Sequence, residues 1–217
     1  MQVGIDVVTH THNRCTNKVH NHTFALKVCT THEQQLILQA SNATHCVWAI
    51  WSLKEAAYKT SCFVGNRKTF VAKHYTVLSL TTITTCKLKF DATNLVTILK
   101  SKVAYKDSIY FGYTFIYTTH LYSLVSTSPL KSNTKLMLSC EATTHTSKKL
   151  YSVEVRNLAT IQLADLGIKG IAFSKTNDGI PYVITDFPKA KRYITLSHDY
   201  TWLAYAMLLN KQPVLIH

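Results

Sequence analysis

The stretch VITDFPKAKRYITL (residues 183–196) contains two strand-like runs that flank a proline turn. The runs VIT (183–185) and RYITL (192–196) are rich in β-branched and aromatic residues, which favour strands. Pro188 lies between them, and three of the next four residues are basic. The pattern predicts a β-hairpin with a cluster of positive charge beside its turn. That cluster is either a solvated hairpin tip or a contact with nucleic acid.

Short runs of the same kind occur elsewhere in the chain, and each predicts a strand. In the first half they are FALKV (24–28), QLILQA (35–40), CVWAIW (46–51), KTFVAK (68–73), YTVLSL (75–80) and TCKLKF (85–90). In the second half they are KLMLSC (135–140), LYSVEV (150–155), TIQLA (160–164), GIAFSK (170–175), PYVIT (181–185) and RYITL. Two segments predict helices, because capping residues open them: DATNLVTILKSK (91–102) and SHDYTWLAYAMLLNK (197–211).

The order of these segments repeats with a period of about 108 residues, which indicates a duplicated unit. In this alignment Cys29 corresponds to Cys140, and Asp91 corresponds to Asp199. We therefore predict a mainly β fold with two small antiparallel β-barrel units, each closed by a C-terminal α-helix. The units span residues 23–102 and 128–217. A polar, histidine-rich segment (1–22) precedes them, and aromatic connecting strands (103–127) join them.

The chain is strongly basic. Lysine and arginine number 24 against 11 aspartate and glutamate, which gives a net charge of +13 with neutral histidines. In a globular chain this excess indicates a polyanionic partner, and RNA, DNA and an anionic membrane surface all qualify. No run approaches the roughly 18 apolar residues of a membrane span, so insertion into a membrane is not expected. The N-terminus shows no secretory signal, and the six cysteines form no CxxC pair, which favours a reducing compartment.

Three motifs of the second half carry a family resemblance: LMLSCEATTHT (136–146), IQLADLGIKGIAFSKTNDG (161–179) and VITDFPKAKRYITL. Together with the closing helix, they resemble non-structural protein 9 of coronaviruses and related nidoviruses. The likeness is clearest over residues 128–217 and weaker over the first half. It departs from the family at the N-terminus, which reads Met-Gln-Val, and in the helices, which lack the glycines of the family's dimer contact.

This resemblance implies a non-enzymatic subunit of a viral replication–transcription complex in the host cytoplasm. Such a subunit binds single-stranded RNA, contacts the viral polymerase or other replicase subunits, and uses no metal or cofactor. Non-specific binding of single strands requires cations for the phosphates and aromatic faces for the bases. The candidate RNA-binding residues are Lys59, Arg67, Lys68, Lys73, Lys169, Lys175, Lys189, Lys191, Arg192, Phe187 and Tyr193.

Eleven histidines leave a viral RNA nuclease or phosphodiesterase as the alternative function. His74 opens a His-x-Thr motif, but the second copy that a two-histidine phosphodiesterase requires is absent. The N-terminal residues His10, His12, Cys15, His20 and His22 could ligate zinc, although a polar segment without metal is favoured. No nucleophile elbow, phosphate-binding loop or paired-carboxylate motif is apparent, so no catalytic residue is predicted.

The two expected helices also predict how the units associate. One carries an apolar stripe of Leu95, Val96 and Leu99, and the other carries Trp202, Leu203, Ala206 and Met207. Apolar stripes of this size are seldom left in water. We expect the two helices to pack on each other within one chain and form a monomeric pseudo-dimer. A homodimer built through the same helices is the alternative.

Overall fold

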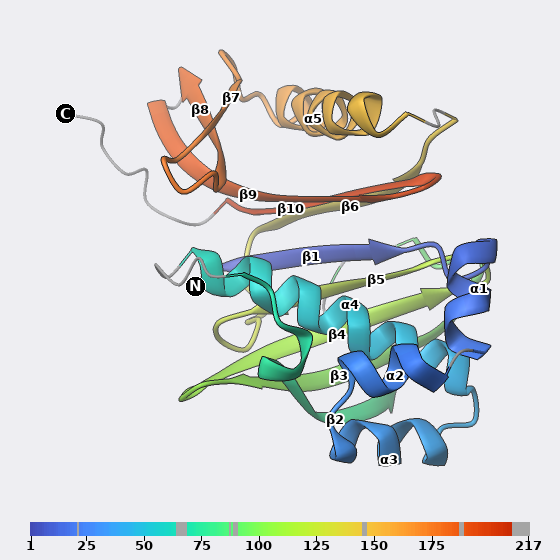
Figure 1. Cartoon of the computed structure of the whole chain (residues 1–217). Coiled ribbons are helices and arrows are strands. Elements are labelled where there is room, and N and C mark those ends of the chain that lie inside the picture. Colours follow the sequence, from blue (N-terminus) through green and yellow to red (C-terminus); the bar gives the residue numbers. More distant parts are fainter. Residues whose placement is uncertain are drawn as a thin grey trace.

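Two antiparallel sheets lie face to face in the computed structural model, with a long helix on the outer side of each (Figure 1). The structure describes residues 1–20, 22–63, 69–86, 88, 91–144, 147–186 and 189–209. The predicted mainly β, antiparallel fold is confirmed at this level. No closed barrel is found in the described part of the chain, because each sheet keeps two edge strands.

The first sheet has the strand order β1-β5-β4-β3-β2. Its strands are β1 (Val3–Val8), β2 (Thr76–Ile83), β3 (Leu95–Tyr105), β4 (Ser108–Tyr117) and β5 (Leu121–Ser126). Between β1 and β2 the chain forms α1 (Asn13–His20), α2 (His22–Val28), α3 (Thr31–Gln39), α4 (Ala43–Cys62) and the short 3-10 helix η1 (Ala72–His74). The edge strand β1 is completely buried and therefore cannot be part of a polar N-terminal segment.

The second sheet has the order β6-β10-β9-β8-β7. Its strands are β6 (Leu136–Ala142), β7 (Ala172–Lys175), β8 (Pro181–Asp186), β9 (Lys189–Asp199) and β10 (Trp202–Leu208), with α5 (Lys148–Asp165) between β6 and β7. Both halves thus follow the same path of strand, helix and four antiparallel strands. The predicted register of this repeat is wrong, since Cys29 follows α2 whereas Cys140 lies on β6.

Three apolar layers hold these elements together. One lies between α4 and the first sheet, and another lies between α5 and the second sheet. The third fills the space between the two sheets, where Val3, Ile5 and Val7 of β1 meet Ala204 and Ala206 of β10. The two halves therefore share a buried core.

The β8–β9 hairpin confirms the prediction for residues 183–196. Asp186 pairs with Lys189 at the end of the ladder, and Phe187 and Pro188 of the turn lie outside the described residues. The predicted strands at 75–80, 135–140 and 170–175 also overlap β2, β6 and β7.

Several other predicted strands are helices. Residues 24–28, 35–40 and 46–51 lie in α2, α3 and α4, and residues 150–155 and 160–164 lie in α5. In α4 twelve side chains are buried, so its sequence shows little polar alternation. A short apolar run of this kind does not distinguish a buried helix from a buried strand. Of the predicted strand 68–73, residues 72–73 lie in η1, and no strand covers the described part of 85–90.

Both predicted helices are strands. Residues 95–102 belong to β3, and residues 202–208 form β10. In β10 alternate side chains enter two different cores: Ala204 and Ala206 face the first sheet, whereas Leu203, Tyr205 and Met207 belong to the cluster around α5. Because both faces are buried, the strand reads as a continuous apolar run that resembles a helix.

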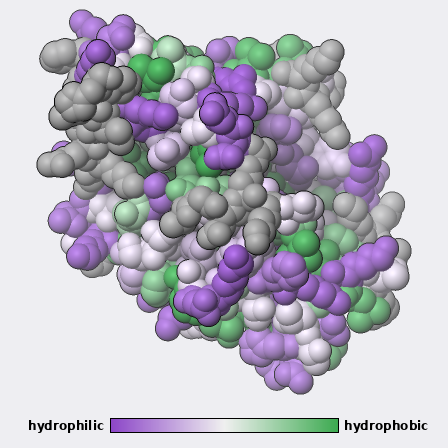
Figure 2. All heavy atoms as spheres, turned by 60° about the vertical axis from the view of Figure 1, so that its left-hand side comes forward, coloured by the Kyte–Doolittle hydropathy of each residue, from purple (hydrophilic) through white to green (hydrophobic). Residues whose placement is uncertain are grey.

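No helix in the described part of the chain is long and apolar enough to cross a membrane. Figure 2 shows one face of the molecule, on which hydrophilic residues predominate and hydrophobic residues occur in separate small areas.

Candidate functional site

A cavity of about 440 Å³ lies where the C-terminal ends of β1 and β9 meet α4. Acidic and basic side chains line it from both halves of the chain: Asp6 from β1, Glu55 and Lys59 from α4, and Ser197 and Asp199 from β9. Trp48, Trp51 and Tyr200 add aromatic surface to the same cavity. Paired carboxylates and an ammonium group in one partly apolar cavity are the usual features of a reactive site.

Asp6 reaches this cavity because β1 packs unusually close to α4. A Cβ atom added at Gly4 would lie 2.1 Å from the carbonyl oxygen of Ala56 and 2.4 Å from Thr60 Oγ1. Only glycine permits this approach, and it places the neighbouring Asp6 beside the helix. Ser52 of α4 also donates a hydrogen bond to the backbone oxygen of Asp6, at 3.2 Å.

On α4 the functional side chains follow the spacing of one helix face. Trp51, Glu55 and Lys59 are separated by four residues each, so their side chains project in the same direction. Asn42 caps the helix, because its side chain accepts a hydrogen bond from the backbone N–H of His45 at 2.9 Å. Lys59 forms an ion pair with Asp6, with Nζ 2.9 Å from Oδ1.

The carboxyl groups of Glu55 and Asp199, which line the same cavity, have raised pKa values. Burial and, to a smaller extent, the Asp6 carboxylate raise the pKa of Glu55 to about 7, against the opposing charge of Lys59. Burial also raises the pKa of Asp199, against hydrogen bonds from Thr9. Glu55 is thus partly protonated near neutral pH, which suits a general acid or base.

The cavity fits a hard divalent cation only in combination with a ligand. Among the described residues, no three His, Cys, Asp or Glu side chains are arranged to hold a metal ion. Mg²⁺, however, commonly binds one or two carboxylates together with substrate phosphates and water. Asp6 meets this requirement with its Oδ2 atom, because the hydrogen bonds that its carboxylate accepts from Lys59 and Ser197 both end on Oδ1.

Lys54 precedes Glu55 in sequence but points away from the cavity. Its ammonium lies 2.6 Å from Glu33 Oε2 and 2.7 Å from the backbone oxygen of Val28, and both side chains of the ion pair are completely buried. Glu33 also accepts hydrogen bonds from the backbone N–H groups of Val77 and Thr30, each at 2.6 Å. The ion pair therefore joins α4 to α3 and β2.

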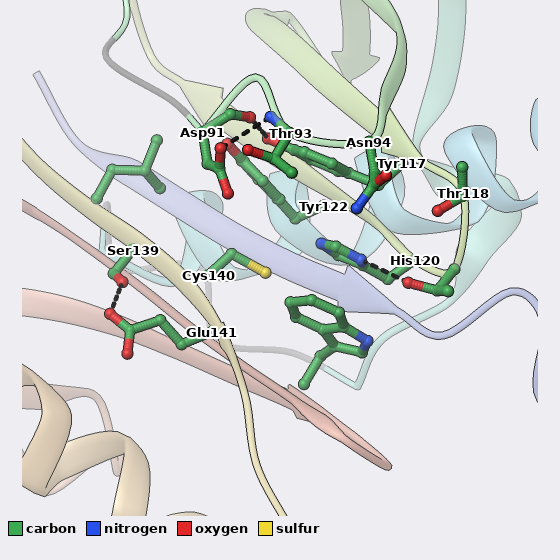
Figure 3. A pocket seen from close by; sticks show the side chains of 13 residues that line it. Asp91, Thr93, Asn94, Tyr117, Thr118, His120, Tyr122, Ser139, Cys140 and Glu141 are labelled. Carbon is green, nitrogen blue, oxygen red and sulfur yellow. Dashed lines mark hydrogen bonds between the residues drawn. The ribbon is translucent and has the colours of Figure 1, made fainter.

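A second cavity, of about 400 Å³, lies at the end of β4 (Figure 3). His120 is stacked between Tyr117 and Trp202, with ring centroids 4.6 and 3.4 Å away, and burial lowers its pKa to about 4. Burial raises the pKa of the Cys140 thiol, which therefore stays protonated. Because both groups are neutral near pH 7, this cavity is the poorer candidate for a reactive site.

The structure places the predicted RNA-binding residues on separate elements. Lys59 lines the cavity at Asp6, Lys73 is in η1, Lys169 follows α5, and Lys175 ends β7. On β9, Lys189 is exposed, Lys191 lies over the ring of Tyr182, and Tyr193 contacts Phe63. Arg67, Lys68 and Phe187 lie outside the described residues.

Arg192 is not a surface cation. It is only 9% exposed, and it donates a hydrogen bond to Thr185 at 3.1 Å. Successive residues of a strand point to opposite faces, so Lys191 and Arg192 cannot act as one cluster.

The residues predicted to pack two helices together lie on strands. Leu95, Val96 and Leu99 are on β3, whereas Trp202, Leu203, Ala206 and Met207 are on β10 of the other sheet. Ala206 does belong to the core between the sheets, and Leu95 and Trp202 pack against that core. The halves thus associate through sheets, and the predicted contact between helices is wrong.

Among the described residues, the histidines favoured by the nuclease hypothesis do not belong to any cluster of three metal-ligating side chains. His10 is buried, and its Nε2 atom lies 2.9 Å from the backbone oxygen of Tyr117. Burial lowers the pKa of His10, whereas His74 is exposed on η1.

A family model described as "ACPS: 4'-phosphopantetheinyl transferase superfamily" matches residues 2–105. The matched segment is slightly less than half of the chain, and it contains Asp6, Glu55 and Lys59. No curated protein and no solved structure matches the chain.

This match overturns the function predicted from the sequence. Because the superfamily consists of transferases, the resemblance to coronavirus non-structural protein 9 and the expectation of a non-enzyme are wrong. Single-stranded RNA and a viral polymerase are contradicted as partners, and the nuclease alternative has no support. The misleading motifs are short strands and turns, which recur in unrelated folds. The location in the host cytoplasm depended on the same resemblance and stays a prediction.

Asp6, Glu55, Ser197 and Asp199 were missed by the sequence reasoning. A signal for Glu55 was present in WSLKEAAYK (51–59), where Trp51, Glu55 and Lys59 share a helical spacing. Because residues 46–51 were predicted to form a strand, this helical spacing was not recognised. Asp6 and Ser197 have no local signal, because only the fold brings β1 and β9 together.

Proposed function

We propose that the chain is a 4'-phosphopantetheinyl transferase, which moves the phosphopantetheine group of coenzyme A onto a serine of a carrier protein. One observation carries this proposal: the fold gathers Asp6, Glu55 and Lys59, all within the segment that matches the superfamily, in one cavity. The net charge of +13 also suits an anionic cosubstrate.

The transfer exchanges a phosphoanhydride bond of coenzyme A for a phosphoester bond to the serine. The serine oxygen of the carrier protein attacks the phosphorus that bears the pantetheine arm, the diphosphate bond breaks, and adenosine 3',5'-bisphosphate leaves. Glu55 accepts the serine proton, since a base is most effective when its pKa lies near the working pH. Lys59 supplies positive charge beside the diphosphate, whose oxygens gain negative charge as the bond breaks.

A divalent cation bound with the substrate would neutralise phosphate charge and orient the diphosphate. Asp6 is the residue that would hold it, which leaves Glu55 to act as the base. The Asp6 carboxylate accepts hydrogen bonds from Lys59 and Ser197 through Oδ1, so these two bonds leave Oδ2 for a cation.

Intact-mass spectrometry of an apo carrier protein incubated with coenzyme A, MgCl₂ and the purified chain tests the proposal. The wild type should add one phosphopantetheinyl group, and Glu55→Gln should slow the addition by about 100-fold or more, the usual contribution of a general base. Asp107→Asn is the matched control, because Asp107 is an exposed carboxylate in the β3–β4 turn. Failure of the folded wild type to modify carrier proteins of several types would reject the function.

A further inference from the structure

Ser197 brings a group from the second half of the chain into the charged centre of the cavity. It lies on β9, outside the segment that matches the superfamily, and it is 6% exposed. Its Oγ atom lies 2.9 Å from Asp6 Oδ1, 3.0 Å from Lys59 Nζ and 3.3 Å from the backbone nitrogen of Val7. One hydroxyl thus contacts the carboxylate, the ammonium and the strand that carries them.

These contacts use the complete hydrogen-bonding capacity of the hydroxyl. A serine hydroxyl donates one hydrogen bond and accepts two. Ser197 donates to Asp6 and accepts from Lys59 and Val7. The Lys59 ammonium, with three donors, is equally occupied, because it donates to Asp6, Ser197 and the backbone oxygen of Ile5.

We propose that Ser197 is a positioning residue, which fixes the Asp6 carboxylate and the Lys59 ammonium relative to each other for the transfer step. The proposal rests on the proposed function for its effect on catalysis, but the arrangement of the three groups does not. Buried networks in which every member is satisfied hold their groups in one arrangement. Without Ser197, the ammonium keeps two of its three acceptors and is free to turn out of the cavity.

A comparison with Thr195 distinguishes this positioning role from a role in holding β1 in place. Alternate side chains of β9 pair with the backbone of β1 and of Thr9 after it: Thr195 Oγ1 accepts from the N–H of Ile5, Ser197 from Val7, and Asp199 from Thr9. Thr195 is buried like Ser197, and its hydroxyl accepts a hydrogen bond from the backbone N–H of Ile5. Thr195→Val therefore removes one hydrogen bond between β9 and β1 but no hydrogen bond to Asp6 or Lys59.

The first experiment compares steady-state transfer by Ser197→Ala and Thr195→Val. We expect kcat of Ser197→Ala to fall roughly tenfold or more, as for other groups that orient a reactive residue, with little change in KM for coenzyme A. Thr195→Val should keep kcat within about twofold, since a hydrogen bond that only holds β1 in place is the same in the ground state and the transition state. If Ser197→Ala does not fold, the isosteric pair Ser197→Thr and Ser197→Val replaces it, and only the hydroxyl-bearing variant should retain activity.

The second experiment does not depend on activity. Labelling of Lys59 by an amine-reactive ester, followed by peptide mass spectrometry, reports how firmly the ammonium is held. Ser197→Ala should label several-fold faster than the wild type, and Thr195→Val should label at the wild-type rate. Faster labelling in a chain without transferase activity would support the positioning role and reject the proposed function. Equal labelling of both variants, or equal loss of kcat in both, would overturn the role of Ser197.

Discussion

Glu55 is the single residue whose chemistry most directly controls the proposed reaction. Burial raises its pKa to about 7, so the carboxylate form that accepts a proton increases as the pH rises through 7. We expect kcat/KM of the wild type to rise about tenfold per pH unit below that value and to level off above it. A pH–rate profile measured from pH 5.5 to 8.5 tests this. A flat profile would remove Glu55 from the role of base.

The same residue should weaken the fold at high pH. A carboxyl whose pKa is raised on folding contributes stability below its unfolded pKa, near 4.5, and loses that contribution as the pH rises through about 7. The neutral variant Glu55→Gln does not incur this loss. It should therefore be more stable than the wild type at pH 8, on the order of 1–3 kcal/mol, and nearly equal at pH 4. Urea unfolding at both pH values measures the difference, and a less stable variant at pH 8 would contradict the pKa shift.

At the level of elements, the buried ion pair Lys54–Glu33 sets the orientation of α4. Lys54→Met would leave the Glu33 carboxylate buried without its cation, which typically costs about 3–5 kcal/mol. Lys102→Met is the matched control, because Lys102 is exposed on β3 and should change stability by less than about 0.5 kcal/mol. Adding Glu33→Gln to Lys54→Met should recover part of the loss. Denaturant unfolding checks all three variants, and additive losses in the double variant would show that the pair is not coupled.

Elements also show what the sequence can and cannot predict. The β8–β9 hairpin was predictable, because its turn residues and β-branched runs are local signals. The segment of β10 was predicted to be a helix, and part of α4 was predicted to be a strand. Both elements are buried on more than one face, so their sequences show no clear alternation of polar and apolar residues. Their type is decided by their neighbours: two cores for β10, and the packing of β1 at Gly4 for α4.

At the level of the whole molecule, the sequence predicted two halves built from antiparallel strands, and the structure has two such sheets, but the predicted alignment of one half on the other is wrong. The insertion of α1, α2 and α3 between β1 and α4 lengthens the first half, so a constant period cannot align the two. The candidate site could not be predicted from the sequence for a related reason. Asp6 and Ser197 are separated by 191 positions, and only the contact of β1 with β9 joins them.

The shared core predicts that the two halves unfold together. Ala206 is completely buried between the sheets, so Ala206→Asp would place a charge without a partner in the layer that joins them. We expect a loss of about 3 kcal/mol or more, because a buried, unpaired carboxylate is among the most destabilising substitutions. Ile161→Asp on the outer face of α5, where Ile161 is 60% exposed, should change stability little. Hydrogen exchange at increasing denaturant should then show α4 and α5 losing protection at the same concentration in Ala206→Asp. If α5 exchanges while α4 stays protected, the halves are independent, and the contact that brings Ser197 to Asp6 is too weak to complete the site.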